Sequence, residues 1–231
     1  MSERRTFTVQ TRGIGRKDYS QNVERYDVQP EILLQEGFEN LPPHWITSGS
    51  AGFVVARNTT IAWVGGACLE LTPPLGVLQN ATYEQLFGLV PSLKLRVDLR
   101  VRFPTFGAGG AFRFGLRRHT GTQLATAELS YDPDANVWSY LNANGVYANI
   151  PGGAQNIGTQ TFHHVTLVVD FQNSRYMYAI VNELFMDMQG LQLFNWPDAL
   201  GPRGRVHVQA LTTGLAAVTF YIDNVRVMEV I

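Results

Sequence analysis

The segment from Ser92 to Phe103 alternates strictly between apolar and polar side chains, and this pattern constrains the fold more than any other feature of the chain. One phase holds Leu93, Leu95, Val97, Leu99, Val101 and Phe103, and the other holds Lys94, Arg96, Asp98, Arg100 and Arg102. Successive side chains of a β-strand point to opposite faces, so the segment predicts a strand that is buried on one face and solvated on the other. On a helix the same apolar residues would spread around the axis.

The same period of two, broken by Gly, Pro and Asn, continues from residue 31 to the end of the chain. It predicts further strands at 32–39, 52–57, 61–71, 111–118, 123–131, 137–141, 162–171, 175–186, 205–212 and 218–230. These strands and their short turns predict an all-β fold, a two-layer antiparallel jelly-roll sandwich. In the last strand the apolar phase changes between Ile222 and Val225, which predicts a β-bulge at Asp223-Asn224.

Two segments depart from this pattern. Thr72 to Pro91 contains Ala81 to Phe87, which favours one or two helical turns with Asn80 as the N-cap. Gly190 to Gly204 predicts a long connection that carries Phe194 and Trp196. Long loops in compact domains are often functional.

Residues 1–35 differ in composition from the sandwich domain predicted at 36–231 and predict an extended N-terminal arm. Residues 1–17 carry a formal charge of 5 − 1 = +4, whereas residues 18–39 carry 1 − 6 = −5. Blocks of opposite charge favour pairing with a neighbouring subunit or with another copy of the chain. A disordered terminus is the alternative. The residues expected to contact partners are Arg4, Arg5, Arg12, Arg16, Lys17, Tyr19 and Tyr26.

The overall charge and the single cysteine exclude several classes of protein. A formal net charge of −1 argues against nucleic-acid binding, which needs a sustained basic face. Cys68 is the only cysteine, so no intramolecular disulfide can form. Residues 1–20 hold no apolar run that resembles a signal peptide, and no stretch approaches 18 consecutive apolar residues. We therefore expect synthesis in a reducing cytoplasm and no membrane span.

Three further segments resemble the concanavalin A-like or laminin G-like jelly-roll superfamily. They are GFENLPPHWITSGSAGFVV, TFHHVTLVVDFQNSRYMYAIVNELFM and VTFYIDNVRVMEV, and the resemblance covers residues 36–231. The resemblance implies the sandwich fold. Because the matching motifs are structural, it says little about activity. The arm segment TRGIGRKDYSQNVE resembles the extended N-terminal segments of some tailed-phage virion proteins, which implies contacts between subunits.

Catalytic and metal-binding patterns are weak in this sequence. Glycoside hydrolysis needs two carboxyl groups across a cleft, and the pair Glu183 and Asp187 is better explained as a solvated strand face. Asp132-Pro133-Asp134-Ala135-Asn136 lacks the glycine and glutamate of a calcium loop and predicts a hairpin turn. His163 and His164 are adjacent on a strand and must face opposite sides. We therefore predict no enzymatic activity, no metal and no cofactor.

Aromatic side chains give the sequence its one indication of a ligand. Trp138 and Tyr140 share one face of the strand at 137–141, and an exposed pair there could stack on the C–H faces of sugar rings. The alternative is that this pair packs under a loop beneath Trp196. Trp138, Tyr140 and Trp196 are therefore the candidate glycan-binding residues.

The arm and the absence of catalytic motifs favour a non-enzymatic virion protein, a capsid decoration or auxiliary protein of a tailed phage. Its expected partners are other capsid or tail proteins and copies of itself, and its expected location is the virion. The alternative function is a lectin-like carbohydrate-binding module, either free or as a host-recognition part of a phage tail. Both functions can coexist in one virion protein.

Overall fold

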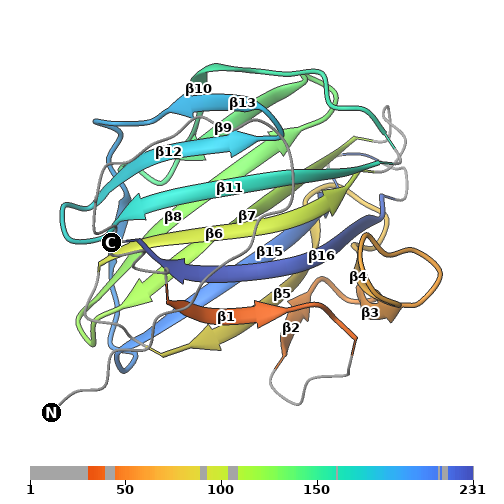
Figure 1. Ribbon diagram of the computed structural model, residues 1–231, viewed down its shortest axis with the longest axis horizontal. Coiled ribbons are helices and arrows are strands. Elements are labelled where there is room, and N and C mark those ends of the chain that lie inside the picture. The colour runs from red at the N-terminus through yellow and green to blue at the C-terminus, as the bar shows by residue number, and fades with distance from the viewer. Residues whose placement is uncertain are drawn as a thin grey trace, which may run out of the picture.

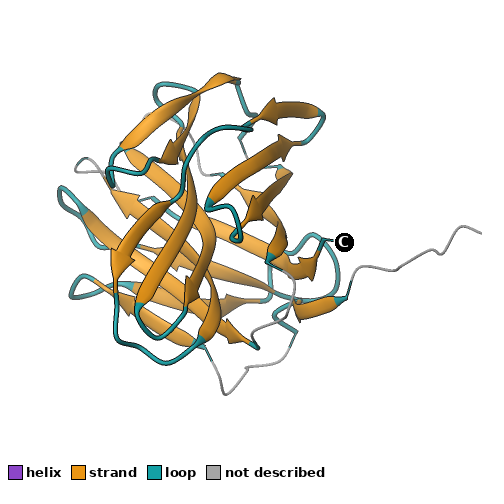
Figure 2. Ribbon diagram, turned by 90° about the vertical axis from the view of Figure 1, so that its left-hand side faces the viewer, coloured by secondary structure: helices purple, strands orange, loops and turns teal. Residues whose placement is uncertain are grey.

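The computed structural model describes residues 31–39, 45–88, 93–103, 109–159, 161–212, 214 and 218–230. These residues form strands and loops and no helix (Figure 2). The arm residues predicted to bind partners, Arg4 to Tyr26, lie outside the described residues.

Two antiparallel sheets of eight strands each build the sandwich predicted from the sequence. Sheet A faces the viewer in Figure 1, and sheet B lies behind it. Sheet A has the order β13-β12-β11-β6-β16-β4-β3, with β1 also paired to β16. Sheet B has the order β10-β9-β8-β7-β15-β5-β2, with β14 also paired to β8.

The strands of sheet A are β1 (Ile32–Glu36), β3 (Val54–Asn58), β4 (Cys68–Thr72), β6 (Lys94–Arg102), β11 (Phe162–Asp170), β12 (Arg175–Val181), β13 (Leu184–Asp187) and β16 (Phe220–Glu229). Those of sheet B are β2 (Ile46–Gly49), β5 (Gln79–Phe87), β7 (Gly110–His119), β8 (Gln123–Asp132), β9 (Val137–Leu141), β10 (Tyr147–Ala154), β14 (Phe194–Pro197) and β15 (Arg203–Thr212).

The apolar phase of each central strand points into the space between the sheets. In β6, Leu95, Val97, Leu99 and Val101 are buried, as the alternation predicts. Phe112, Phe114 and Tyr131 meet them from sheet B, and Phe103 packs its ring against those of Phe112 and Tyr131. One continuous hydrophobic core therefore joins the two layers.

The predicted helical turns at 81–87 are wrong, because this segment is part of β5 in sheet B. Ala81, Tyr83 and Phe87 point into the core at alternate positions, while Thr82 and Glu84 belong to the other face. The strand is paired along its length with β15, and Asn80, instead of capping a helix, stands opposite Leu211. Burial of one face outweighed the local preference for a turn of helix.

Several local predictions are confirmed. The register between β16 and β6 shifts between Asp223 and Arg226, and Asn224 has φ 52°, so the predicted bulge is present. The segment at 133–136 is the turn of the β8–β9 hairpin, where Asp132 accepts hydrogen bonds from the backbone N–H groups of Asp134 and Ala135. The long connection at 190–204 differs from expectation, since it contributes the short strand β14 to sheet B.

Candidate functional site

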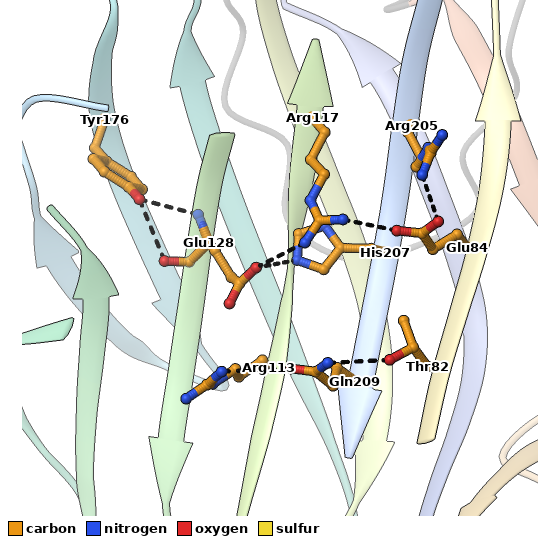
Figure 3. A network of polar contacts seen from close by, with 9 residues as sticks. All are labelled: Thr82, Glu84, Arg113, Arg117, Glu128, Tyr176, Arg205, His207 and Gln209. Carbon is orange, nitrogen blue, oxygen red and sulfur yellow. Dashed lines mark hydrogen bonds and ion pairs between the residues drawn. The ribbon is translucent and has the colours of Figure 1, made fainter. Parts of the chain in front are cut away.

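The outer face of sheet B, turned away from the core, carries a row of polar side chains from four neighbouring strands (Figure 3). In the middle of β7 and β15 the core-facing side chains are Phe112, Phe114, Leu116, Val206, Val208 and Ala210. The opposite phase is Arg113, Gly115, Arg117, Arg205, His207 and Gln209. Thr82 and Glu84 extend the row onto β5, and Glu128 extends it onto β8.

Gly115 allows the central contact of this network to form. His207 on β15 and Glu128 on β8 both stand opposite Gly115, on either side of β7. Because glycine has no side chain, the His207 Nε2 atom reaches across β7 to the Glu128 carboxylate. A Cβ at position 115 would lie 2.0 Å from the Ala127 carbonyl oxygen, so no larger residue fits here without a shift of the backbone.

Arginine side chains complete the network around the two carboxylates. The Arg117 guanidinium donates to Glu84 at 2.8 Å and lies 3.7 Å from Glu128, and Arg205 donates to the other Glu84 oxygen at 2.6 Å. Burial alone would raise the pKa of Glu128, but His207 and the nearby arginines outweigh it, and the pKa falls below its usual range. Burial lowers the pKa of His207, so at neutral pH a neutral imidazole donates to an ionised Glu128.

The position of Glu128 is fixed from the core side by Tyr176. Strand β8 pairs with β14 at residues 123–126 and with β9 at residues 129–132, which leaves the Glu128 backbone between the two partners. The Tyr176 hydroxyl fills this gap. It accepts from the Glu128 N–H at 3.0 Å and lies 3.3 Å from the Glu128 carbonyl oxygen and 2.9 Å from that of Leu141.

An open pocket of about 490 Å³ lies over the place where β8 changes its partner from β14 to β9. Its polar lining comes from Arg113, Arg117, Thr126, Glu128 and Gln209, and its apolar and aromatic lining from Leu124, Leu141, Tyr147 and Phe194. Concave sites with a few convergent polar groups and aromatic walls are typical of ligand binding.

Among the polar side chains that line this pocket, Arg113 has the most N–H donors without a hydrogen-bond or ion-pair partner in the described part of the chain. Its guanidinium lies 4.2 Å from the centre of the Tyr147 ring, and one terminal nitrogen lies 3.5 Å from the Gln209 side-chain oxygen. Its Nε is buried without a hydrogen-bond partner, and it forms no ion pair with any carboxylate among the described residues. Arg117, in contrast, is already engaged by Glu84.

The structure separates the three aromatic residues predicted to bind glycan. Trp138 is fully buried and packs against Tyr131 and Phe114, and Tyr140 is half-buried against Tyr176. Both point to the inner side of β9, so the expected exposed pair does not exist. The alternation predicted their common face correctly, but a single sequence does not show which face of a strand is buried.

Trp196 does lie on the outer face of sheet B. It stands opposite Leu124 and is 60% exposed, and Phe194 stands opposite Thr126 with its ring centre 6.1 Å from that of Trp196. Phe194 and Tyr147 line the pocket, and Trp196 lies beside it through its contact with the Phe194 ring. Sequence reasoning missed Arg113, Arg117, Glu128, His207 and Gln209. Their signal is present as polar residues at alternate positions, in Arg113-x-Gly115-x-Arg117 with a glycine at the centre and in Arg205-x-His207-x-Gln209.

No family model matches the chain, and no curated protein matches it by sequence. Solved structures do match it. An endo-β-1,4-glucuronan lyase from the fungus Trichoderma reesei aligns with a TM-score of 0.64 at 10% identity, over 87% of this chain and 96% of the lyase. The carbohydrate recognition domain of Emp47p gives 0.53 at 11% identity, over 83% and 90% of the two chains.

A third similar structure is the CBM2 module of the evolved Dit protein of Lactobacillus casei BL23 phage J-1. It aligns with a TM-score of 0.50 at 9% identity, over 87% of this chain and 97% of the module. The fold is the concanavalin A-like jelly roll. This fold occurs in lectins, in carbohydrate-active enzymes and in phage carbohydrate-binding modules.

Within the part of the chain that the structure describes, no three His, Cys, Asp or Glu side chains gather as a metal site. His163 and His164 take opposite faces as predicted. His163 packs its ring near Phe103 in the core, and His164 lies on the outer face of sheet A. No helix of the described residues is long and apolar enough to cross a membrane.

Proposed function

We propose that the protein binds an acidic carbohydrate chain on the outer face of sheet B. The observation that carries this proposal is Arg113, a cation that is stacked on Tyr147 at the pocket floor and forms no ion pair with a described carboxylate. A guanidinium group binds a carboxylate through two parallel hydrogen bonds, which suits the carboxylate of a uronic acid.

The charge of the floor and its aromatic border support an acidic sugar. Arg113, Arg117 and Arg205 against Glu84 and Glu128 give 3 − 2 = +1. Trp196, Phe194 and Tyr147 offer flat faces for the C–H groups of sugar rings. The similar glucuronan lyase acts on a polymer of this class, which agrees with the proposal.

Calorimetric titration with uronic-acid and neutral oligosaccharides tests this function. We expect saturable binding of the acidic chains, weakened by added salt, and at least about tenfold weaker binding for Arg113→Gln, because a hydrogen bond to a charged group contributes about 1.5–3 kcal/mol. Arg118→Gln is the matched control, since Arg118 lies on the same strand in the opposite phase. Equal binding by both variants, or no binding of any acidic chain, would refute the proposal.

We propose further that this face binds sugar without cleaving it. Glycoside hydrolysis needs a carboxylic acid that still holds a proton at working pH, and the lowered pKa of Glu128 works against that role. Incubation with the bound oligosaccharide should leave its length unchanged. Growth of reducing ends, or of the ultraviolet absorbance of an unsaturated uronate, would instead identify an enzyme.

A virion location, in the tail or the head of a phage, is a second proposal, and the likeness to a module of a phage J-1 protein supports it. In this proposal the sandwich presents its sugar face outward and residues 1–30 anchor it to other virion proteins. In the head, a decoration protein of the capsid is consistent with such an anchoring arm. Antibody labelling of virions by electron microscopy distinguishes head from tail. If a chain lacking residues 1–30 enters virions with unchanged occupancy, the anchoring role should be abandoned.

A further inference from the structure

The outer face of sheet A, on the opposite side of the molecule from the pocket over Glu128, holds a second charged hollow. It has a volume of about 240 Å³ and is lined by Arg96, Asp98, Leu99, Arg100, His164, Asn224 and Arg226. These residues come from three adjacent strands, β11, β6 and β16. This hollow is separate from the face proposed to bind carbohydrate.

Positive charge dominates the hollow. Three arginines oppose one carboxylate, which gives a formal balance of 3 − 1 = +2 for these four side chains. Burial alone would raise the pKa of Asp98, but hydrogen bonds from His164, Arg96 and Thr166 outweigh it and lower the pKa, so the carboxylate is ionised. Arg96 binds that carboxylate through both oxygens, at 2.9 Å each. Asp98, the one carboxylate of the hollow, is therefore already paired with Arg96.

The other two arginines keep their bonding capacity. The Arg100 guanidinium lies 4.9 Å from the centre of the Trp63 ring, a cation–π contact that holds the group in place and leaves its N–H donors available. The Nε of Arg226 is buried without a hydrogen-bond partner. Neither arginine forms an ion pair with a carboxylate in the described ranges. An unpartnered buried donor is costly, and a ligand that accepts from it removes that cost.

The bulge in β16 brings Arg226 to this face. Asp223 stands opposite Arg100 and Arg226 stands opposite Asp98, so β16 places one more residue between these pairs than β6 does. Without that extra residue, position 226 would fall in the apolar phase occupied by Val225 and Val227. The left-handed Asn224 at the bulge lines the hollow itself. Bulges often re-aim side chains next to binding sites.

We infer that this hollow binds a tetrahedral oxyanion, the sulfate or phosphate group of a free ion or of an ester. The guanidinium groups of Arg100 and Arg226, from two adjacent strands, can together donate to more oxygens than the two of a carboxylate, and a group with three or four acceptor oxygens uses them best. The excess of positive charge and the unpaired Nε of Arg226 both favour such a ligand.

Titration of the full chain with sodium sulfate and sodium phosphate at constant ionic strength tests the inference, followed by NMR at the Asn224 amide and the His164 ring. We expect saturable shifts at both positions and none with sodium chloride at equal ionic strength. Arg226→Gln should weaken binding at least about tenfold. Arg226→Lys should also weaken it, since lysine lacks the planar fork. Dextran sulfate as a second probe, titrated into the Arg113→Gln variant so that the pocket of sheet B does not contribute, separates the sources: tighter binding than sulfate indicates an esterified polymer, and equal binding indicates the free ion.

Arg113→Gln is the matched control, because it removes an arginine from the opposite sheet and should leave sulfate binding unchanged. The two proposals fail separately, since Arg226→Gln should leave the sugar affinity unaltered. If Arg226→Gln does not fold, Arg100→Gln carries the same expectation. Linear shifts that never saturate, or wild-type affinity in the folded variants, would overturn the inference.

Discussion

At the scale of the residue, the polar network of sheet B depends on Gly115. This residue stands between His207 and Glu128 on the two neighbouring strands, and the hydrogen bond between their side chains passes over it. Gly115→Ala places a methyl carbon 2.0 Å from the Ala127 carbonyl oxygen and 2.8 Å from the Glu128 Cα atom. We expect a loss of about 1–3 kcal/mol of unfolding free energy, as for other overpacked sites. Urea unfolding measures it.

The matched control for this substitution is Gly201→Ala, since a Cβ at position 201 would meet nothing within 4 Å. That variant should unfold within about 0.5 kcal/mol of the wild type. Equal stability of the two alanine variants would show that β7 adjusts freely at position 115.

Asp223 is a second residue whose environment predicts a measurable effect. One of its carboxylate oxygens accepts from the backbone N–H groups of Trp63 and Val64, at 2.8 and 3.1 Å, yet burial raises its pKa. A group with a raised folded pKa stabilises the fold below its unfolded pKa of about 3.9, and this stabilisation is lost as pH rises through the folded value.

Asp223→Asn keeps an acceptor oxygen for the same two N–H groups and removes the charge. The variant should therefore be more stable than the wild type at pH 7, and the difference should shrink toward pH 4. Urea unfolding at a series of pH values checks this. A difference that stays constant across the series would contradict the assigned cause.

At the scale of the element, β8 changes partners at Glu128, and the Tyr176 hydroxyl from sheet A supplies the missing backbone contacts. Tyr176→Phe leaves the Glu128 N–H and the Leu141 carbonyl without this partner. We expect a cost of about 1–3 kcal/mol and faster hydrogen exchange at the Glu128 amide.

Tyr178→Phe is the control for the same strand, because Tyr178 is half-buried on the outer side and packs its ring on Phe185. It should change neither stability nor exchange at Glu128. If the Glu128 amide exchanges hydrogen at the same rate in both phenylalanine variants, the Tyr176 hydroxyl does not protect the β8 backbone at this point.

Strands in which apolar and polar residues alternate strictly were predictable from the sequence. Strands that form only because they pair with a distant strand were not. The phase of β6 and the bulge of β16 follow from local apolar spacing, and both predictions are confirmed. Strand β5 was predicted as helix because its short apolar pattern is ambiguous until β15 pairs with it. The sugar face escaped prediction because Arg113, Glu128 and His207 are far apart in sequence and meet only through strand order.

At the scale of the whole molecule, the last strand, β16, joins the first described strand to the middle of sheet A. β16 pairs with β1, β4 and β6, so it lies between the beginning of the described chain and the centre of sheet A (Figure 1). Phe220, Ile222, Val225 and Val227 carry its contribution to the core. Contacts of such long sequence separation form only when most of the chain is present.

A chain ending at residue 217 should therefore lack cooperative unfolding, because removal of β16 exposes the core and leaves β1 and β4 without their central partner. Thermal denaturation followed by near-ultraviolet circular dichroism measures this. Removal of residues 1–30 is the control, since every described strand lies between Ile32 and Glu229, and this shortened chain should keep one sharp transition. A cooperative transition in the chain ending at 217 would show that sheet A assembles without its closing strand.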